Sequence, residues 1–126
     1  MKLRMQNGSV RLRLSPEEVR AFGDVGVLEE SVYFGAGEKQ RFVYRIEVGV
    51  GSSTIAADID HNAITISIPP ATAAEWVVSQ QVSLEAGQGI GDGRYLNILI
   101  EKDFARLRPR SNEDVEEKFP HPRAPE

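Results

Sequence analysis

The feature that most constrains the fold of this chain is a pattern of residues that occurs twice, 54 positions apart. Apolar residues alternate with polar ones over residues 10–14 and again over 64–68, and a proline follows two positions later, at Pro16 and at Pro70. The same offset relates the glycine pairs and the later alternating segments, at 35–37 and 89–91 and at 42–46 and 96–100. We therefore predict that the chain contains two copies of one structural unit.

The first unit begins with a tight hairpin. Alternation predicts two strands on either side of Asn7 and Gly8, a dipeptide typical of two-residue turns. Ser15 is then a candidate N-cap, and Pro16 suits the first position of a short helix. A second hairpin is expected between residues 27 and 50, so each unit consists of two strands, a short helix and two further strands.

One such unit is too small to be stable alone, because about fifty residues bury little apolar surface. We expect a β-rich α+β fold in which two ββαββ repeats, residues 1–50 and 54–104, form one barrel-like domain with two short helices and a pseudo-two-fold axis. The whole domain is expected to span residues 1–105. Residues 106–126 are rich in proline and in charge, and we expect them to form a C-terminal tail.

The order of the predicted elements carries a resemblance to a known fold. Together with residues 10–22 and 64–76, it resembles the swapped-hairpin barrel of AbrB-type transition-state regulators and antitoxins, over most of residues 1–102. In that fold two copies interleave into one barrel, sometimes within a single chain. The resemblance implies that the first hairpin contributes to a DNA-binding surface.

The two ends of the chain carry a second resemblance. Residues Arg11–Val19 and Glu101–Pro122 resemble the start "RLRL(S/T)xxEV" and the end "EKDFxxLxPR…ED…FPxP" of a small uncharacterised bacterial domain family. A cysteine often follows "EKDFx" in that family, and this chain has Arg106 at that position. The resemblance implies no known activity.

The composition narrows the class of protein further. The chain has no cysteine, which excludes disulfides, thiolate metal sites and cysteine nucleophiles. No apolar run is long enough for a signal peptide or a membrane span, so we expect a cytoplasmic protein without a membrane partner. The net charge of −4 disfavours attraction of the whole chain to nucleic acid.

The first hairpin contains the main candidate site. A two-residue turn at residues 7–8 pairs Arg4 with Arg11 and Lys2 with Arg13, all on the polar side of the hairpin. Like charges directly opposite each other are destabilising, so something must balance them. One interpretation is an anionic partner, either a protein or another anion. The other is an acidic group of the chain itself, for which we expect Glu29, Glu47 or the acidic tail.

The second unit tests the nucleic-acid interpretation. The positions that match the four basic residues are not basic, namely Ala56, Asp58, Thr65 and Ser67. A protein that reads a palindromic DNA site needs two equivalent faces, and this chain offers one. Nucleic acid therefore stays an alternative partner that the sequence disfavours.

Three further segments favour structural interpretations. The glycine run at residues 87–93 lacks the features of a phosphate loop and predicts a hairpin loop. His61 lies near Asp58 and Asp60, but this composition is typical of a turn, so we predict no metal site and no cofactor. Glu30 falls at a core position of its strand, where we expect either an inward carboxylate or a bulge that shifts the strand.

No set of acid, base, nucleophile or metal ligands is visible, so we expect no enzyme activity. The sequence predicts a small non-catalytic binding module, as a monomer or homodimer, whose candidate surface is Lys2, Arg4, Arg11 and Arg13. The alternative is a nucleic-acid-binding regulator of the AbrB or antitoxin type. Residues 106–126 either form a disordered tail or pack back on the domain, and in the second case Glu113, Asp114, Glu116 and Glu117 would cover the basic hairpin and compete with anions.

Overall fold

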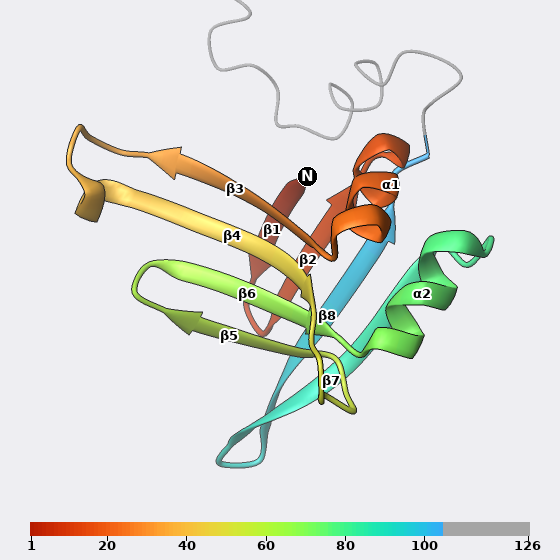
Figure 1. The fold of residues 1–126 in the computed structure, drawn as a ribbon. Coiled ribbons are helices and arrows are strands. Elements are labelled where there is room, and N and C mark those ends of the chain that lie inside the picture. Colours follow the sequence, from red (N-terminus) through yellow and green to blue (C-terminus); the bar gives the residue numbers. More distant parts are fainter. Residues whose placement is uncertain (105–126) are drawn as a thin grey trace, which may run out of the picture.

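Two four-stranded sheets and two helices make up the part of the chain that the computed structural model describes, residues 1–104 (Figure 1). The elements in chain order are β1 (Lys2–Gln6), β2 (Ser9–Leu14), α1 (Pro16–Val25), β3 (Val27–Tyr33), the short 3-10 helix η1 (Glu38–Gln40), β4 (Arg41–Val48), β5 (Ala56–Asp60), β6 (Ala63–Ile68), α2 (Pro70–Val78), β7 (Ser83–Gly91) and β8 (Arg94–Lys102). The predicted β-rich α+β class is confirmed.

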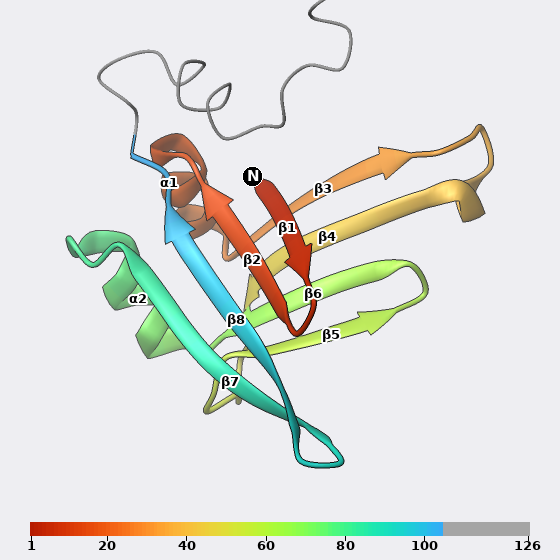
Figure 2. The same ribbon diagram turned by 180° about the vertical axis from the view of Figure 1, so that it is seen from behind.

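Each sheet combines a hairpin from the first half of the chain with a hairpin from the second. Sheet A has the strand order β1-β2-β8-β7, and sheet B has the order β3-β4-β6-β5. The hairpins are antiparallel, whereas the central pairs β2–β8 and β4–β6 are parallel. Figures 1 and 2 show the two sheets crossing, with both helices at one end. Neither half therefore forms a complete sheet by itself.

Local sequence signals set the limits of α1. Ser15 accepts a hydrogen bond from the backbone N–H of Glu18, and the Glu18 carboxylate accepts one from the backbone N–H of Ser15. This reciprocal capping box satisfies two N–H groups that a helix start otherwise leaves free. Gly26 ends the helix with φ of 90°, a conformation that glycine adopts without steric cost. The predicted N-cap is confirmed.

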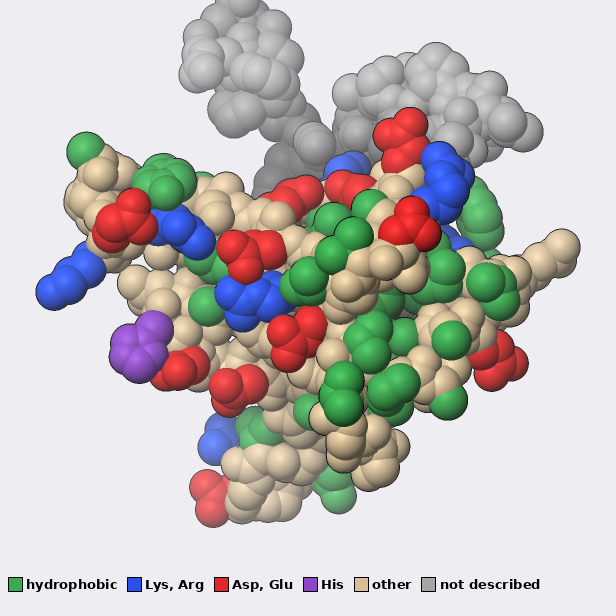
Figure 3. All heavy atoms as spheres, viewed as in Figure 1, with side chains coloured by type: hydrophobic (Ala, Val, Ile, Leu, Met, Phe, Trp, Pro, Cys, Tyr) green, Lys and Arg blue, Asp and Glu red, His purple; other side chains and the backbone are tan. Residues whose placement is uncertain are grey.

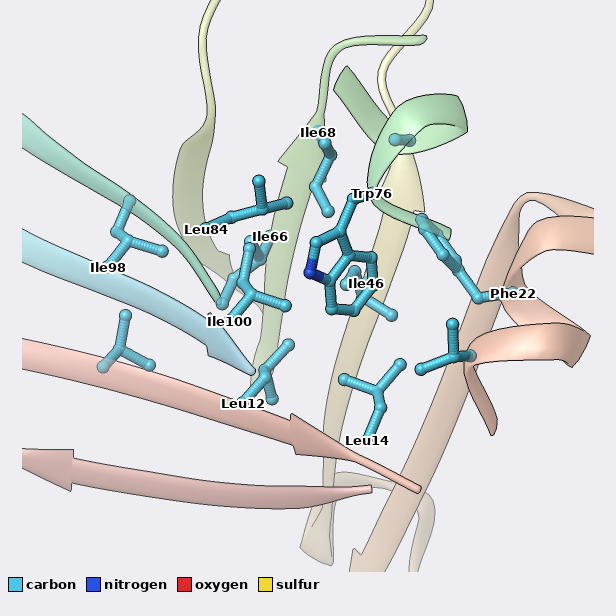
Figure 4. Packing of buried hydrophobic residues seen from close by; sticks show 13 residues of the cluster. Leu12, Leu14, Phe22, Ile46, Ile66, Ile68, Trp76, Leu84, Ile98 and Ile100 are labelled. Carbon is cyan, nitrogen blue, oxygen red and sulfur yellow. The ribbon is translucent and has the colours of Figure 1, made fainter. Parts of the chain in front are cut away.

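The core lies between the inner sides of the two sheets and beneath the helices (Figure 4). Trp76 of α2 is fully buried, and its indole N–H donates to the backbone oxygen of Val82 at 3.2 Å. Phe22 of α1 is buried beside it. Most of the alternating apolar residues that the sequence predicts on one side of the strands are buried as well: Val10, Leu12, Leu14, Ile64, Ile66, Ile68, Ile98 and Ile100. Leu3 is half-buried and Met5 is exposed. The helices approach closely at Gly23, where an added Cβ would lie 2.7 Å from Val77 Cγ1.

The predicted barrel-like domain does not close into a barrel, because within residues 1–104 no backbone ladder joins sheet A to sheet B. At the edge between β5 and β7, the Gln88 side chain makes hydrogen bonds to the backbone that a neighbouring strand would otherwise make. Its amide oxygen accepts from the backbone N–H of Ala57 at 2.7 Å, and its amide nitrogen donates to the backbone oxygen of Ala57 at 2.9 Å. A bulge between Gly89 and Gly91 then interrupts the regular register of β7. The internal repeat and the domain limits stay predictions.

Replacing Gln88 by alanine should lower the free energy of unfolding by about 1–2 kcal/mol, because it leaves the N–H and C=O of Ala57 without these partners at a partly buried edge. Urea denaturation measures this change. Gln6→Ala serves as the control, since the Gln6 side chain is exposed and makes no hydrogen bond within residues 1–104. Equal stability of the two variants would show that Gln88 does not hold the sheets together.

Candidate functional site

The four basic residues predicted from the sequence lie together on the outer side of sheet A, the side turned away from the core. The predicted register of the hairpin is confirmed, with Arg4 opposite Arg11 and Lys2 opposite Arg13. We call Lys2, Arg4, Arg11 and Arg13 the basic face. The neighbouring strands add Glu101 beside Arg13 and Glu85 beyond Leu99, both on the same side. The outer side of sheet A thus carries four cationic and two anionic side chains.

Glu101 of β8 balances part of the basic face. Arg13 donates from Nε and Nη2 to its Oε1 at 3.3 and 3.2 Å, and Arg11 donates from Nη2 to its Oε2 at 3.5 Å. The Arg11 Nε is buried and makes no hydrogen bond, although it lies 3.3 Å from Glu101 Oε1. One carboxylate therefore serves two guanidinium groups.

The acidic residues expected to balance the basic face within the described chain lie elsewhere. Glu29 pairs with Arg45 at 2.7 Å and with Arg41 at 3.6 Å, and Glu47 accepts from Ser67 at 3.4 Å, all on sheet B. That expectation was wrong because the parallel pairing of β2 with β8 brings Glu101, not Glu29 or Glu47, next to β2. The third expected source, the acidic segment 109–126, lies outside the described residues.

Lys2 and Arg4 form no ion pair with any residue that the structure describes. Both side chains belong to the edge strand β1 and are exposed. Lys102 differs from them, although it lies near the end of the same sheet. Its Nζ donates to the backbone oxygen of Ser79 at 2.7 Å and lies 5.4 Å from the centroid of the Trp76 ring, and burial lowers its pKa. Lys102 therefore adds little accessible charge to sheet A, whereas Lys2 and Arg4 present theirs to solvent.

A groove of about 550 Å³ crosses the outer side of sheet A beside these cations. Arg4 and Arg11 line it on one side and Glu85 and Gly87 of β7 on the other, and Asn97 of β8 lies between them. A Cβ added at Gly87 would meet no atom within 4 Å, so the glycine leaves the groove open there. No sequence pattern indicated this groove, because it is shaped by strands from both halves of the chain.

The outer side of sheet B has the opposite charge. The positions that match the basic face, Ala56 with Ser67 and Asp58 with Thr65, pair in the same register as their basic counterparts. Over β3 to β6 this side carries four acidic and two basic side chains, namely Glu29, Glu47, Asp58, Asp60, Arg41 and Arg45. Figure 3 shows acidic side chains beside basic ones on this side of the molecule. The two sheets therefore share a core pattern but not a surface.

The His61 and glycine segments are turns. His61 and Asn62 both have positive φ, 51° and 65°, as a two-residue hairpin turn requires, and His61 pairs with Asp60 at 2.8 Å while remaining exposed. The glycine run forms the end of β7 and the turn at Asp92 and Gly93, so the predicted hairpin is confirmed. Within residues 1–104, no three His, Asp or Glu side chains lie close enough together to hold a metal ion.

A cluster of charged groups closes the edge between β1 and β3. The Met1 amine donates to the carboxylate of Glu18 and, at 3.1 Å, to that of Glu30, and the Tyr44 hydroxyl lies 2.9 Å from Glu30 Oε1. β3 pairs with β4 without a register shift, so Glu30 faces inward and the alternative of a bulge is wrong. The sequence did not reveal the partners of Glu30, because the amine and Tyr44 come from other strands.

The cluster shifts the pKa values of its members. Burial alone would lower the pKa of the Met1 amine, but the hydrogen bonds and charges of Glu18 and Glu30 outweigh it and raise this pKa above 8.0. Burial likewise would raise the pKa of Glu18, but the amine and Ser15 hold it below 4.5. Burial, with the Glu30 hydrogen bond and charge, raises the pKa of Tyr44 to about 12. The amine and Glu18 are therefore both charged at neutral pH.

A family model matches residues 1–123 of the chain. The chain belongs to DUF7009, a family of unknown function. The DUF7009 match covers the basic face, the groove and both helices, and it confirms the expected membership of an uncharacterised domain family. No curated protein and no solved structure matches the chain. The bacterial origin of the family and the relationship to the AbrB fold stay predictions. Neither helix among residues 1–104 is long and apolar enough to cross a membrane.

The charged cluster predicts a specific pH dependence of stability. The lowered pKa of Glu18 contributes stability that is present above pH 4.5 and is lost as the pH falls through the folded-state pKa. The raised pKa of the amine contributes stability that is present below pH 8.0 and is lost as the pH rises through the folded-state pKa. Between these limits, Glu18→Gln should lower the free energy of unfolding by about 1 kcal/mol, since glutamine keeps the capping box but loses the charge.

Thermal unfolding from pH 3 to pH 10 measures this difference. Glu17→Gln is the matched control, because Glu17 precedes Glu18 on α1 and its side chain is exposed and makes no hydrogen bond or ion pair within residues 1–104. A constant difference between wild type and Glu18→Gln across the whole pH range would contradict the assignment.

Proposed function

We propose that the protein is a small non-catalytic binding module that uses the basic face and its groove to bind an acidic segment of a partner protein. The observation that carries this proposal is the unbalanced charge on the outer side of sheet A. Lys2 and Arg4 have no ion pair among residues 1–104, and Arg11 and Arg13 share the single carboxylate of Glu101. A carboxylate placed between Arg4 and Arg11 would relieve the repulsion of two cations that lie directly opposite each other.

The surroundings of the cations support an extended acidic segment as the ligand. The groove passes over all four strands of sheet A, with amide groups of Gln6 and Asn97 beside the guanidinium groups. Arginine side chains bind carboxylates through paired hydrogen bonds, and amides add neutral donors and acceptors for a peptide backbone. The open space at Gly87 leaves room for such a backbone.

The charges around the groove favour a protein ligand over nucleic acid. Glu85 lines the groove and would repel a continuous phosphate backbone, whereas a peptide can place a neutral or basic residue there. The outer side of sheet B carries more acidic than basic side chains, so a DNA duplex would meet a favourable surface only on sheet A. The chain as a whole carries a net charge of −4. Nucleic acid is the alternative that the experiment below separates.

The proposal includes an internal repeat of residues 1–50 and 54–104 in a cytoplasmic protein that is a monomer or a homodimer. The offset of 54 positions relates buried residues in the two halves and so supports the repeat, as in Leu12 with Ile66, Phe22 with Trp76 and Ile46 with Ile100. In this interpretation selection kept the buried positions alike and let the surfaces diverge. The absence of cysteine supports a reducing compartment.

Arg4→Glu should weaken binding of a labelled polyglutamate peptide by about tenfold or more, because it replaces an unpaired cation of the basic face by an anion. Fluorescence anisotropy measured from low to physiological salt gives the affinities, with labelled random duplex DNA as the second probe. Arg20→Glu changes the net charge equally on exposed α1 surface and should leave the affinity unchanged. No peptide binding at low salt would overturn the proposal, and DNA binding stronger than peptide binding would favour the nucleic-acid regulator.

Glu101→Gln should act in the opposite direction. Loss of this carboxylate frees Arg11 and Arg13 for an external anion, so the affinity for polyglutamate should rise about two- to fivefold. The same anisotropy titration detects the change. Glu47→Gln on sheet B removes an equal charge away from the groove and should have no comparable effect. A decrease in affinity for Glu101→Gln would mean that Glu101 holds the arginines in their binding conformation.

A further inference from the structure

An apolar opening lies between the two sheets where they fail to join, at the end away from the helices. It has a volume of about 420 Å³, and its apolar lining includes Met5, Val10, Ile59, Ile64, Ile90 and Leu96. We call this opening the apolar mouth. Met5 pairs with buried Val10, and Ile59 pairs with buried Ile64, so both belong to the inner sides of their sheets.

The apolar mouth exposes side chains that a closed barrel would bury. Met5 is 56% exposed, Ile59 67% and Ile90 47%. Three large apolar side chains gathered at one opening form a patch of the kind that marks an interaction surface. The volume lies within the range of pockets that hold small apolar groups.

The apolar mouth is continuous with the basic groove. Gln6, Ser9 and Val10, which flank the β1–β2 turn, line both cavities. A segment that passes over this turn therefore leaves the groove beside Arg4 and enters the mouth beside Met5. A single extended ligand can occupy the two cavities without any change in the positions of the sheets.

The charges around the two cavities determine which part of such a ligand occupies which cavity. The groove contains Arg4 and Arg11, whereas no Lys or Arg among residues 1–104 lines the mouth, and the side chain of Asp58 at its rim belongs to the outer side of sheet B. An acidic side chain of the ligand finds cations in the groove and none in the mouth, so the acidic residues are confined to the groove. Gln88, another polar residue of the mouth lining, already uses its amide group on Ala57.

We infer that the partner segment is bipartite, with acidic residues that bind the basic face and a large apolar side chain, next to them in sequence, that fills the apolar mouth. This inference rests on the proposed function and specifies the ligand of the same surface. Burial of the apolar side chain removes surface of the ligand and of Met5, Ile59 and Ile90 from water, and it should strengthen binding by about tenfold relative to an acidic segment alone.

A displayed library of random peptides, selected on the full chain, tests the inference. The enriched peptides should share acidic residues followed or preceded by a large apolar residue. Their affinity should fall about tenfold on Arg4→Glu and on Ile59→Ser, since these variants remove one half of the surface each. Val50→Ser is the matched control, because Val50 is 91% exposed and lies away from both cavities.

A double-mutant cycle then links the apolar residue of the peptide to the apolar mouth. Replacing that residue by serine should weaken binding to the wild type about tenfold and have little further effect on Ile59→Ser. Acidic peptides without an apolar residue, insensitive to Ile59→Ser, would overturn this inference and leave the proposed function intact. No enrichment, or peptides insensitive to Arg4→Glu, would overturn both.

Discussion

The parallel pairing of β2 with β8, and of β4 with β6, is the contact on which the rest of the molecule depends. These two central pairs join the halves of the chain in both sheets, and the core residues on them come from both halves. The aromatic rings of Phe22 and Trp76 can be buried only when both sheets are in place beneath the helices. The site depends on the same pairing, because it brings Glu101 to the arginines of β2 and completes the groove with Asn97 and Gly87.

Local features of the fold were predictable, because they depend on neighbouring residues. The register across Asn7 and Gly8 follows from the turn, the start of α1 follows from Ser15 and Pro16, and the buried side of each strand follows from alternation. The turn and the alternation were also enough to predict that one side of the hairpin carries all four basic residues: Lys2, Arg4, Arg11 and Arg13.

The partners of these elements were not predictable, because they come from distant parts of the chain. Arg13 and Glu101 are 88 positions apart, and no pattern in either segment indicates that the two residues are in contact. The barrel stays open at Gln88. Its side chain forms hydrogen bonds with the backbone of Ala57 at the edge of β5, where a closed barrel would have a backbone ladder. Glu30 occupies a position that suits a leucine in the matching strand, and its carboxylate is accommodated by an amine and a hydroxyl from elsewhere.

The outer sides of the two sheets carry opposite charge, with a cationic excess on sheet A and an anionic excess on sheet B, and both point away from the common core. Over residues 1–104, such an arrangement produces an electric dipole between the outer sides of the two sheets. The field of a charged partner exerts a torque on this dipole, so the protein rotates before contact and presents one side first. Association is then faster than for randomly oriented collisions. The gain in association rate shrinks once the distance between the two partners exceeds the Debye length, about 8 Å at physiological ionic strength. The surface divergence of two similar halves thus affects how an encounter begins, before any contact in the groove is made.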